Sequence, residues 1–234
     1  MPKQPLTSSV VIEPAILYFG TPVVLLSTLN EDGSANLAPM SSAFWLGWRC
    51  VLGLGAGSRT AENLLRTGQV ALNLPSPAQV DAVDRLARLT GSNPVPESKR
   101  KRGYTHEKHK FEAAGLTPVA SETILPPRAR ECPVQMEAVS SATHDLMQDD
   151  AAWRGQIKVF EVRIQRVHVH PGLLMQGQAN RIDPDLWRPL IMSFQQFYQL
   201  APGRLRPSRL GEIAESAYLT PDALRAREAP QQSR

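Results

Sequence analysis

Residues 53–60, Gly-Leu-Gly-Ala-Gly-Ser-Arg-Thr, combine a glycine-rich corner with two hydroxyl side chains and one guanidinium. An apolar, strand-like run enters this corner and a helical pattern leaves it, so unpaired backbone N–H groups and the positive end of a helix dipole should meet here. Such a helix start binds anions, and Ser58, Arg59 and Thr60 add donors suited to a phosphate group. The alternative is a plain strand-to-helix turn in which Ser58 only caps the helix.

Two common phosphate-binding motifs do not fit this segment. A dinucleotide-binding fingerprint needs glycine three residues after Gly55, where this chain has Ser58. It also needs an acidic residue at the end of the next strand, where this chain has Asn-Leu-Pro at residues 73–75. A Walker loop needs Gly-Lys followed by Ser or Thr, and the sequence contains no such tripeptide. A phosphate would therefore bind in another structural framework.

Residues 36–44, Asn-Leu-Ala-Pro-Met-Ser-Ser-Ala-Phe, form the second candidate segment. Pro39 removes one backbone donor from a strand, which predicts an edge strand or a bulge at this point. A bulge would expose backbone amides and carbonyls beside the hydroxyls of Ser41 and Ser42. Such a surface suits the polar edge of a flat heteroaromatic ring such as flavin. The alternative is a serine-rich loop without a ligand.

The elements around these two segments predict a mainly β fold. Asp32-Gly33 between two extended runs is a strong hairpin signal, because glycine tolerates the positive φ that such a turn needs. Strands are predicted where apolar and β-branched residues gather, at residues 23–29, 35–46, 50–55, 69–74, 132–144 and 156–170. Helices are predicted at residues 59–66, 78–89 and 183–198. Because strands and helices do not alternate regularly, a closed or partly closed antiparallel barrel is favoured over a doubly wound sheet.

Composition narrows the class of protein. Lys and Arg number 26 against 22 Asp and Glu, and a net charge of +4 is small for a dedicated nucleic-acid binder. The 20 prolines argue against long helices and coiled coils. Two cysteines without CxxC spacing, no membrane-length apolar run and no signal-peptide pattern predict a soluble, cytoplasmic protein. We expect one domain over residues 1–200 and a loosely held Arg- and Pro-rich extension over residues 201–234.

Taken in order along the chain, several stretches resemble the flavin reductase-like family, the FMN-binding split barrels. The stretches are residues 36–42, residues 58–60 with Asn63, and residues 68–73, 111–117, 131–137 and 155–170. The resemblance covers about residues 18–170, and its specificity lies in the ordered set because no single tripeptide is diagnostic. It implies a six-stranded antiparallel split β-barrel with a few peripheral helices. It also implies a homodimer with FMN near the subunit interface.

The same resemblance implies roles for individual residues. One set would line the flavin ring and the ribityl chain: Pro39, Met40, Ser41 and Ser42. A second set would hold the phosphate: Ser58, Arg59 and Thr60. Asn36 would be a further FMN contact, although Asn36 and Asn73 can also serve the fold alone. The phosphate assignment is physically favourable, because each charge-assisted hydrogen bond is worth about 1.5–3 kcal/mol.

Two histidine pairs and one basic run have competing interpretations. His106 and His109 lie in a charged loop and do not form an HExxH motif. His168 and His170 lack an accompanying cysteine or carboxylate cluster, so no metal site is predicted. The basic run at residues 99–102 is interpreted as a solvated loop. Its alternatives are a nucleic-acid contact and a lid that attracts the phosphates of NADPH.

These patterns predict an FMN-containing oxidoreductase that oxidises NAD(P)H and passes electrons to flavin or another small acceptor. No catalytic side chain is predicted, because flavin chemistry needs the protein only for position and electrostatic field. A rival interpretation is a non-catalytic, flavoredoxin-like carrier whose FMN exchanges electrons with protein partners. A third is an RNA- or DNA-binding barrel without a cofactor. The leading interpretation expects neither a nucleic-acid nor a membrane partner.

Overall fold

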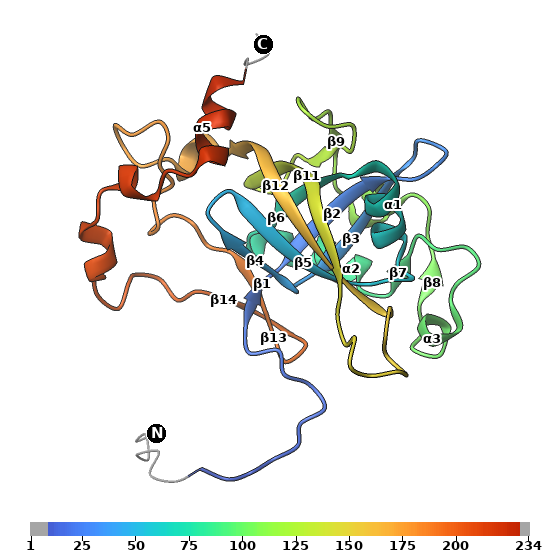
Figure 1. Cartoon of the computed structure of the whole chain (residues 1–234). Coiled ribbons are helices and arrows are strands. Elements are labelled where there is room, and N and C mark those ends of the chain that lie inside the picture. The colour runs from blue at the N-terminus through green and yellow to red at the C-terminus, as the bar shows by residue number, and fades with distance from the viewer. Residues whose placement is uncertain (1–8, 230–234) are drawn as a thin grey trace.

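The computed structural model describes residues 9–229, and a seven-stranded antiparallel sheet forms its centre (Figure 1). In spatial order its strands are β3 (Ala35–Met40), β2 (Val24–Leu29), β6 (Gln69–Leu74), β11 (Val134–Asp145), β12 (Ile157–Val169), β5 (Arg49–Gly55) and β4 (Ala43–Leu46). The predicted mainly β, antiparallel class is confirmed. The strand number differs from the predicted six, because the run at residues 35–46 is divided into β3 and β4 at Ser41 and Ser42.

β3 and β4 are neighbours in the sequence but lie at opposite edges of the sheet. Met40 ends β3 and Ala43 begins β4, so only three Cα steps of about 3.8 Å each join the two edges. The sheet therefore curls until its edges approach one another and form an incompletely closed barrel. The N–H of Gly53 on β5 donates to the carbonyl oxygen of Ser42 (2.9 Å) and holds this corner. Pro39 lies on an edge strand, as predicted, where its missing N–H is tolerated.

The hydrophobic core has two parts, one on each face of β2. Inside the barrel, Val24 and Leu26 pack with Phe160 of β12, and all three side chains are fully buried. Outside the barrel, Val23 and Leu25 pack against two helices. These are α2 (Val80–Leu86) and α4 (Lys110–Ala114). Burial of both faces explains why this strand has a continuous apolar run rather than an alternating pattern.

Helix α1 (Arg59–Thr67) begins and ends close to where the sequence predicts. The Ser58 Oγ caps it by accepting a hydrogen bond from the N–H of Ala61 (3.2 Å). Gly68 ends it with a φ of 65°, a left-handed conformation that glycine adopts without strain. The helix predicted at residues 78–89 is present as α2, which follows the 3-10 helix η1 (Pro77–Gln79), but it ends at Leu86, and Leu89 lies in a short strand.

Shorter elements surround the barrel. β7 (Leu89–Thr90) and β8 (Thr105–His106) form a parallel pair that flanks α3 (Glu97–Arg100) on one side of the molecule (Figure 1). The remaining short elements are β9 (Pro118–Val119), β10 (Arg128–Ala129), and the 3-10 helices η2 (Pro171–Leu173), η3 (Arg209–Glu212) and η4 (Glu215–Tyr218). None of the helices in the part of the chain described here is long and apolar enough to cross a membrane.

The helix predicted at residues 183–198 is wrong. The structure has a sheet made of β1 (Thr21–Pro22), β13 (Leu190–Ser193) and β14 (Gln196–Gln199). Pro189 would lie in the middle of the expected helix, where proline removes a hydrogen bond and clashes with the preceding turn. Leu190 is instead buried in the outer part of the core, and its N–H donates to the carbonyl oxygen of Pro75 (3.0 Å). Tertiary pairing, rather than local propensity, decides the conformation here.

Part of the C-terminal segment is docked on the barrel, in contrast to the loosely held tail that we expected. Helix α5 (Pro221–Glu228) buries Asp222 and Ala223. The carboxylate of Asp222 pairs with Arg49 (Nε to Oδ2, 2.7 Å), and Arg49 also pairs with Glu161 of β12 (2.6 Å). These contacts tie α5 to two neighbouring strands of the sheet.

The structure shows the surroundings of the two cysteines but does not test the expected division into units. Cys50 and Cys132 are fully buried free thiols, and burial raises the pKa of each to about 12. Both therefore pack as small apolar residues. The division into units at residues 1–200 and 201–234 stays a prediction. The ends of these two units, residues 1–8 and 230–234, lie outside the described residues.

Candidate functional site

The two segments singled out in the sequence line one cavity of about 360 Å³. All the predicted site residues except Ser41 and Ser42 line it, namely Asn36, Pro39 and Met40 of β3 and Ser58, Arg59 and Thr60 at the start of α1. Further walls come from Leu26, the glycines of β5, and the residues Thr90, Gly91, Lys99, Tyr104 and Lys110. The curled sheet thus places the β3 edge beside the N-terminal end of α1.

A buried polar network holds these two segments in register. The amide nitrogen of Asn36 donates to the hydroxyl oxygens of Thr60 (3.1 Å) and Thr28 (3.3 Å). The amide nitrogen of Asn63 also donates to Thr28 (3.1 Å). All four side chains are buried, and each such hydrogen bond contributes about 1 kcal/mol. The network positions Thr60, and with it the first turn of α1, against the hairpin formed by β2 and β3.

The N-terminal end of α1 offers unsatisfied backbone donors to the cavity. Ser58 caps the helix and also lines the cavity. The backbone N–H groups of Arg59 and Thr60 make no hydrogen bond within residues 9–229, as is usual in a first helical turn. Because these N–H groups lie at the positive end of the helix dipole, they favour an anion.

Arg59 is held in place by two neighbours. Its Nη1 pairs with the carboxylate of Glu62 (2.9 Å), and its Nε donates to the carbonyl oxygen of Gly91 (3.3 Å). Glu62 therefore compensates much of the charge that the sequence analysis assigns to phosphate binding. Arg59 keeps further N–H donors in its guanidinium, but the excess positive charge of the cavity comes from elsewhere.

Two lysines that the sequence analysis does not select for the phosphate site supply that charge. Lys110, the first residue of α4, is 3% exposed, and its ammonium makes no hydrogen bond or ion pair with another described residue. Burial, helped by the neighbouring charge of Lys99, lowers the pKa of Lys110 to about 8, and the charge of Glu107 opposes this shift only in part. Lys99 donates to the hydroxyl of Thr90 (3.1 Å), and burial lowers its pKa as well. Lys99 belongs to the basic run at residues 99–102, which the sequence analysis considers, whereas no local sequence pattern indicates that Lys110 enters the cavity.

Gly91 and Asn36 shape the cavity between the lysines and β3. A Cβ on Gly91 would lie 2.6 Å from the Asn36 Oδ1 and 3.1 Å from the Cγ of Arg59, so only glycine fits there. The Asn36 Oδ1 is buried and accepts no hydrogen bond in the structure. A buried acceptor without a partner is costly, and a ligand hydroxyl would satisfy it. The cavity therefore suits a ligand with hydroxyl groups and an anionic end.

Three other residues named in the sequence analysis have structural roles in this fold. Ser41 and Ser42 form the corner between β3 and β4, outside the cavity wall. The amide of Asn73 donates to the carbonyl oxygen of Leu25 (3.0 Å) and accepts from the N–H of Ala129 (2.7 Å). Asn73 thereby joins β6 to β2 and β10, which supports the fold-only interpretation of this residue.

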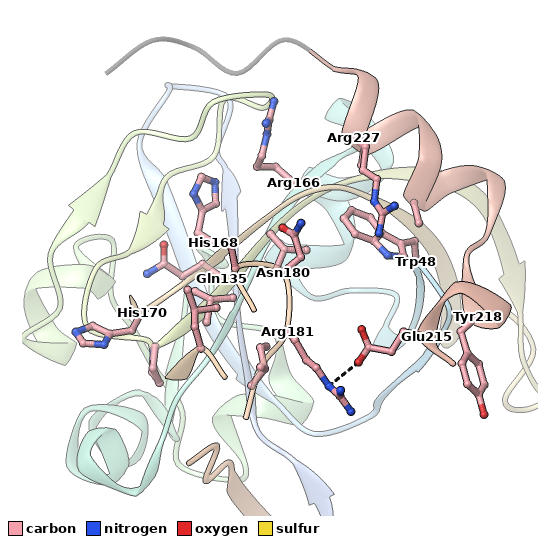
Figure 2. Close-up of a pocket in the computed structure, with 18 of the residues that line it drawn as sticks. Trp48, Gln135, Arg166, His168, His170, Asn180, Arg181, Glu215, Tyr218 and Arg227 are labelled. Carbon is pink, nitrogen blue, oxygen red and sulfur yellow. Dashed lines mark ion pairs between the residues drawn. The ribbon is translucent and has the colours of Figure 1, made fainter. Parts of the chain in front are cut away.

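A larger groove, of about 1300 Å³, lies between β11, β12 and the C-terminal segment (Figure 2). Arg181 pairs with Glu215 across it (2.8 Å). On its β12 wall, the Nε2 of His168 lies 2.8 Å from the fully buried carboxylate of Glu137. Burial alone would raise the pKa of Glu137, but hydrogen bonds from His168 and Thr123 outweigh burial and lower the pKa to about 2.

His168 is thus a hydrogen-bonding partner of a structural carboxylate. His170 follows the end of β12, and its Nδ1 accepts from the N–H of Gly172 (3.1 Å). Within residues 9–229 there is no group of three or more His, Cys, Asp or Glu side chains arranged to hold a metal ion.

Comparisons with known proteins agree with this architecture. The family described as "Flavin reductase like domain" matches residues 16–201. A Bacillus subtilis (strain 168) protein, the uncharacterized YdfE, is 37% identical over 189 residues, which is 81% of this chain and 88% of that protein. Flavoredoxin of Desulfovibrio vulgaris (Miyazaki F) has a similar fold, with a TM-score of 0.65 at 20% identity, over 90% of this chain and all of its own.

Nitrilotriacetate monooxygenase component B from Bacillus cereus is similar to the same degree, with a TM-score of 0.65 and 20% identity. That match covers 85% of this chain and 98% of the other. At such identities the two structures show the fold alone, whereas the family match spans most of the sequence. The chain therefore belongs to the flavin reductase-like family.

Proposed function

We propose that the chain binds FMN in the 360 Å³ cavity and acts as an NAD(P)H-dependent flavin reductase. The observation that carries this proposal is the buried ammonium of Lys110, which lines the same cavity as the N-terminal end of α1. A buried cation that makes no direct ion pair is costly, so its retention points to an anionic ligand. Membership in the flavin reductase-like family makes a flavin phosphate the natural candidate.

The phosphate of FMN would lie between α1 and the two lysines. The backbone N–H groups of Arg59 and Thr60 would donate to it, together with the remaining donors of the Arg59 guanidinium. Lys99 and Lys110 make no ion pair with the described residues, so their two positive charges match the two negative charges of a phosphomonoester.

The rest of the cofactor would extend along β3. The Asn36 Oδ1 would accept a hydrogen bond from a ribityl hydroxyl, which removes the cost of its unsatisfied burial. Pro39 and Met40 are partly buried and would form an apolar surface beneath the flavin ring. The open edge of β3 offers backbone groups to the polar side of the ring, because β3 pairs only with β2 in the described sheet.

When bound, FMN supplies a ring that accepts hydride from a reduced nicotinamide and passes electrons to a small acceptor or a second flavin. The residues of the chain bind and orient the ring and exclude water from its buried face. No side chain needs to act as a nucleophile or base, since holding two rings in contact accounts for much of the rate enhancement. We accordingly assign no catalytic side chain.

A second candidate function is a non-catalytic FMN carrier that exchanges electrons with protein partners. The structural similarity to flavoredoxin of Desulfovibrio vulgaris supports this alternative. The two functions share the cofactor site and differ in whether a nicotinamide reduces the bound flavin directly.

The proposal includes a cytoplasmic homodimer. The side chains of Val10, Val11 and Ile12 are between 70% and 97% exposed and form an apolar run before the barrel. Contiguous exposed apolar residues are typical of protein contact surfaces. Light scattering coupled to gel filtration measures the mass in solution, and a monomer at every concentration would contradict this part of the proposal.

The function is tested by titration and rapid mixing. Quenching of flavin fluorescence measures FMN binding, and stopped-flow absorbance measures reduction of the bound FMN by NADH and by NADPH. Binding followed by reduction within the turnover time supports the reductase. Binding without reduction supports the carrier. Absence of FMN binding contradicts both and leaves a barrel without this cofactor.

A further inference from the structure

An arginine-rich rim surrounds Tyr104, next in the chain to Ala87, Leu89 and Lys99, which line the cavity. We define the rim as Arg88, Arg100, Arg102 and Tyr104, which lie on or next to β7, α3 and β8 (Figure 1). Tyr104 lines the cavity itself. The guanidinium carbon of Arg102 lies 5.7 Å from the centroid of the Tyr104 ring, within the range of a cation–π contact. A Cβ on Gly103 would lie 3.7 Å from Arg88, which places Arg88 beside the same turn.

The arginines of the rim have no ion-pair partner among the described residues. Two acidic side chains near them are engaged elsewhere, since Glu62 pairs with Arg59 and Glu97 pairs with Lys101. Glu107 accepts a hydrogen bond from the N–H of His109 (2.6 Å). In contrast, the three arginines of the rim make no ion pair with any residue between positions 9 and 229. All three are exposed, so a ligand in solution can reach them.

The positive charge of the rim is also more than is needed to balance the phosphate of the proposed FMN. Lys99 and Lys110 inside the cavity suffice to balance a dianionic phosphate. The charge of Arg102 acts on Lys99 and that of Lys99 acts on Lys110, so positive charge continues from the rim into the cavity. A second anionic ligand at the rim would relieve this repulsion.

The backbone holds the rim in a defined position. The N–H of Tyr104 donates to the carbonyl oxygen of Lys99 (3.1 Å), and the N–H of Thr105 donates to that of Arg88 (3.0 Å). The Nε of Arg102 donates to the carbonyl oxygen of Ser98 (3.0 Å). Because the backbone of the rim and the Arg102 side chain are positioned before any ligand arrives, binding costs less conformational entropy than binding to a mobile loop.

We propose that the rim binds the adenosine 2′-phosphate of NADPH and makes the protein selective for NADPH over NADH. The proposal rests on the proposed reductase function. The adenine would stack on the Tyr104–Arg102 pair, and the forked guanidinium groups of Arg88 and Arg100 would bind the 2′-phosphomonoester. The reacting nicotinamide end of the molecule would enter the cavity beyond Tyr104, toward β3. NADH lacks the 2′-phosphate and so leaves the arginines unsatisfied.

Binding of a fragment tests the rim independently of catalysis. Isothermal titration of the FMN-loaded protein compares adenosine 2′,5′-bisphosphate with adenosine 5′-monophosphate, which lacks the 2′-phosphate. We expect the bisphosphate to bind roughly 10- to 100-fold more tightly, the value of one or two charge-assisted contacts. Equal affinities for the two fragments, or no binding of either, would overturn the proposal.

Steady-state kinetics provides the second test. In the variant Arg88→Gln/Arg100→Gln, which removes the two guanidinium groups assigned to the 2′-phosphate, the KM for NADPH should rise roughly tenfold or more, whereas the KM for NADH should not change. Arg206→Gln/Arg209→Gln, an equal loss of two charges at exposed arginines that make no ion pair with the described residues, should leave both KM values unchanged.

The possible outcomes separate this inference from the proposed function. Reduction of bound FMN by NADH and NADPH with equal kcat/KM would refute NADPH selectivity and leave the reductase intact. An equal rise in the KM for NADPH and in the KM for NADH in the double variant would likewise contradict a 2′-phosphate site. Failure of FMN to bind, or to be reduced by either nicotinamide, would instead contradict the proposed function, and the fragment titration on the FMN-free protein would then decide the rim on its own.

Discussion

Replacing Lys110 with methionine should stabilise the apoprotein and weaken FMN binding, two effects of opposite sign from one side chain. Burial lowers the pKa of the Lys110 ammonium from 10.5 to about 8. Since each tenfold change in proton affinity is worth about 1.4 kcal/mol, the charged side chain destabilises the apoprotein by on the order of 3 kcal/mol at pH 7. Methionine has a similar shape and no charge, so the variant should recover much of that free energy of unfolding.

The pH dependence of this effect has a definite sign. Below about pH 8 the folded and unfolded forms both carry the proton on Lys110, and the full destabilisation is present. Between about pH 8 and 10.5 the folded form has released the proton while the unfolded form still binds it, so wild-type stability should rise with pH. The variant Lys110→Met should lack this rise.

FMN binding should respond in the opposite direction. A phosphate next to Lys110 supplies the missing counter-charge, and a charge-assisted contact is worth about 1.5–3 kcal/mol. Lys110→Met should therefore bind FMN roughly 10- to 100-fold more weakly. Riboflavin, which has the same ring and no phosphate, should bind the variant and the wild type equally well.

Urea unfolding of the apoprotein at pH 7 measures the first effect, and quenching of flavin fluorescence measures the second. Lys101→Met is the matched control, because Lys101, which directly follows α3, is exposed and pairs with Glu97 (3.0 Å). It should change stability by no more than about 0.5 kcal/mol. A Lys110→Met protein that is less stable than the wild type and binds FMN normally would refute the reasoning.

Three further changes probe the same site and the sheet behind it. The variant Arg59→Ala/Thr60→Ala should bind FMN roughly tenfold more weakly or worse in a fluorescence titration, with the circular dichroism of a folded β protein; unchanged affinity would remove the phosphate assignment. Gly91→Ala should lower both the melting temperature and FMN affinity, because the new Cβ would lie 2.6 Å from a buried oxygen, an overpacking cost of about 1–3 kcal/mol. Gly57→Ala, with no atom within 4 Å of the new Cβ, is its control and should be much milder. The folded-state pKa of Glu137 is about 2 against 4.5 in the unfolded chain, so wild-type stability should fall as the pH drops from 4.5 toward 2. Glu137→Gln should be less stable at pH 7, and its free energy of unfolding should not show this loss at low pH. If the free energies of unfolding of the two proteins fall in parallel with pH, Glu137 does not cause the loss.

Local features of the site were accessible from the sequence. Ser58 and Gly68 mark the two ends of α1 because capping depends on residues within one turn of the helix end. Pro39 indicates an edge strand because proline lacks the N–H that an inner strand needs. Each of these predictions depends on the chemistry of a few consecutive residues, and the structure confirms each of them.

The prediction at residues 183–198 failed because the competing interactions are long-range. The apolar spacing there resembles a helix, yet Leu190 pairs with residues far away in the sequence and is buried in the outer core. The positive φ values of Phe194 (46°) and Gln195 (63°) at the turn between β13 and β14 also have no signal in these residue types. Only the packed structure selects the hairpin.

The sequence by itself determined the two segments of the cavity, the mainly β class and the resemblance to the flavin reductase-like family. Tertiary structure alone decided that these segments meet, because their meeting depends on the sheet curling until β3 and β4 approach. It also decided that Lys110 enters the cavity. A lysine is ordinarily solvated, and only packing of α4 against the barrel buries this one, so its shifted pKa follows from surroundings that no local sequence pattern contains.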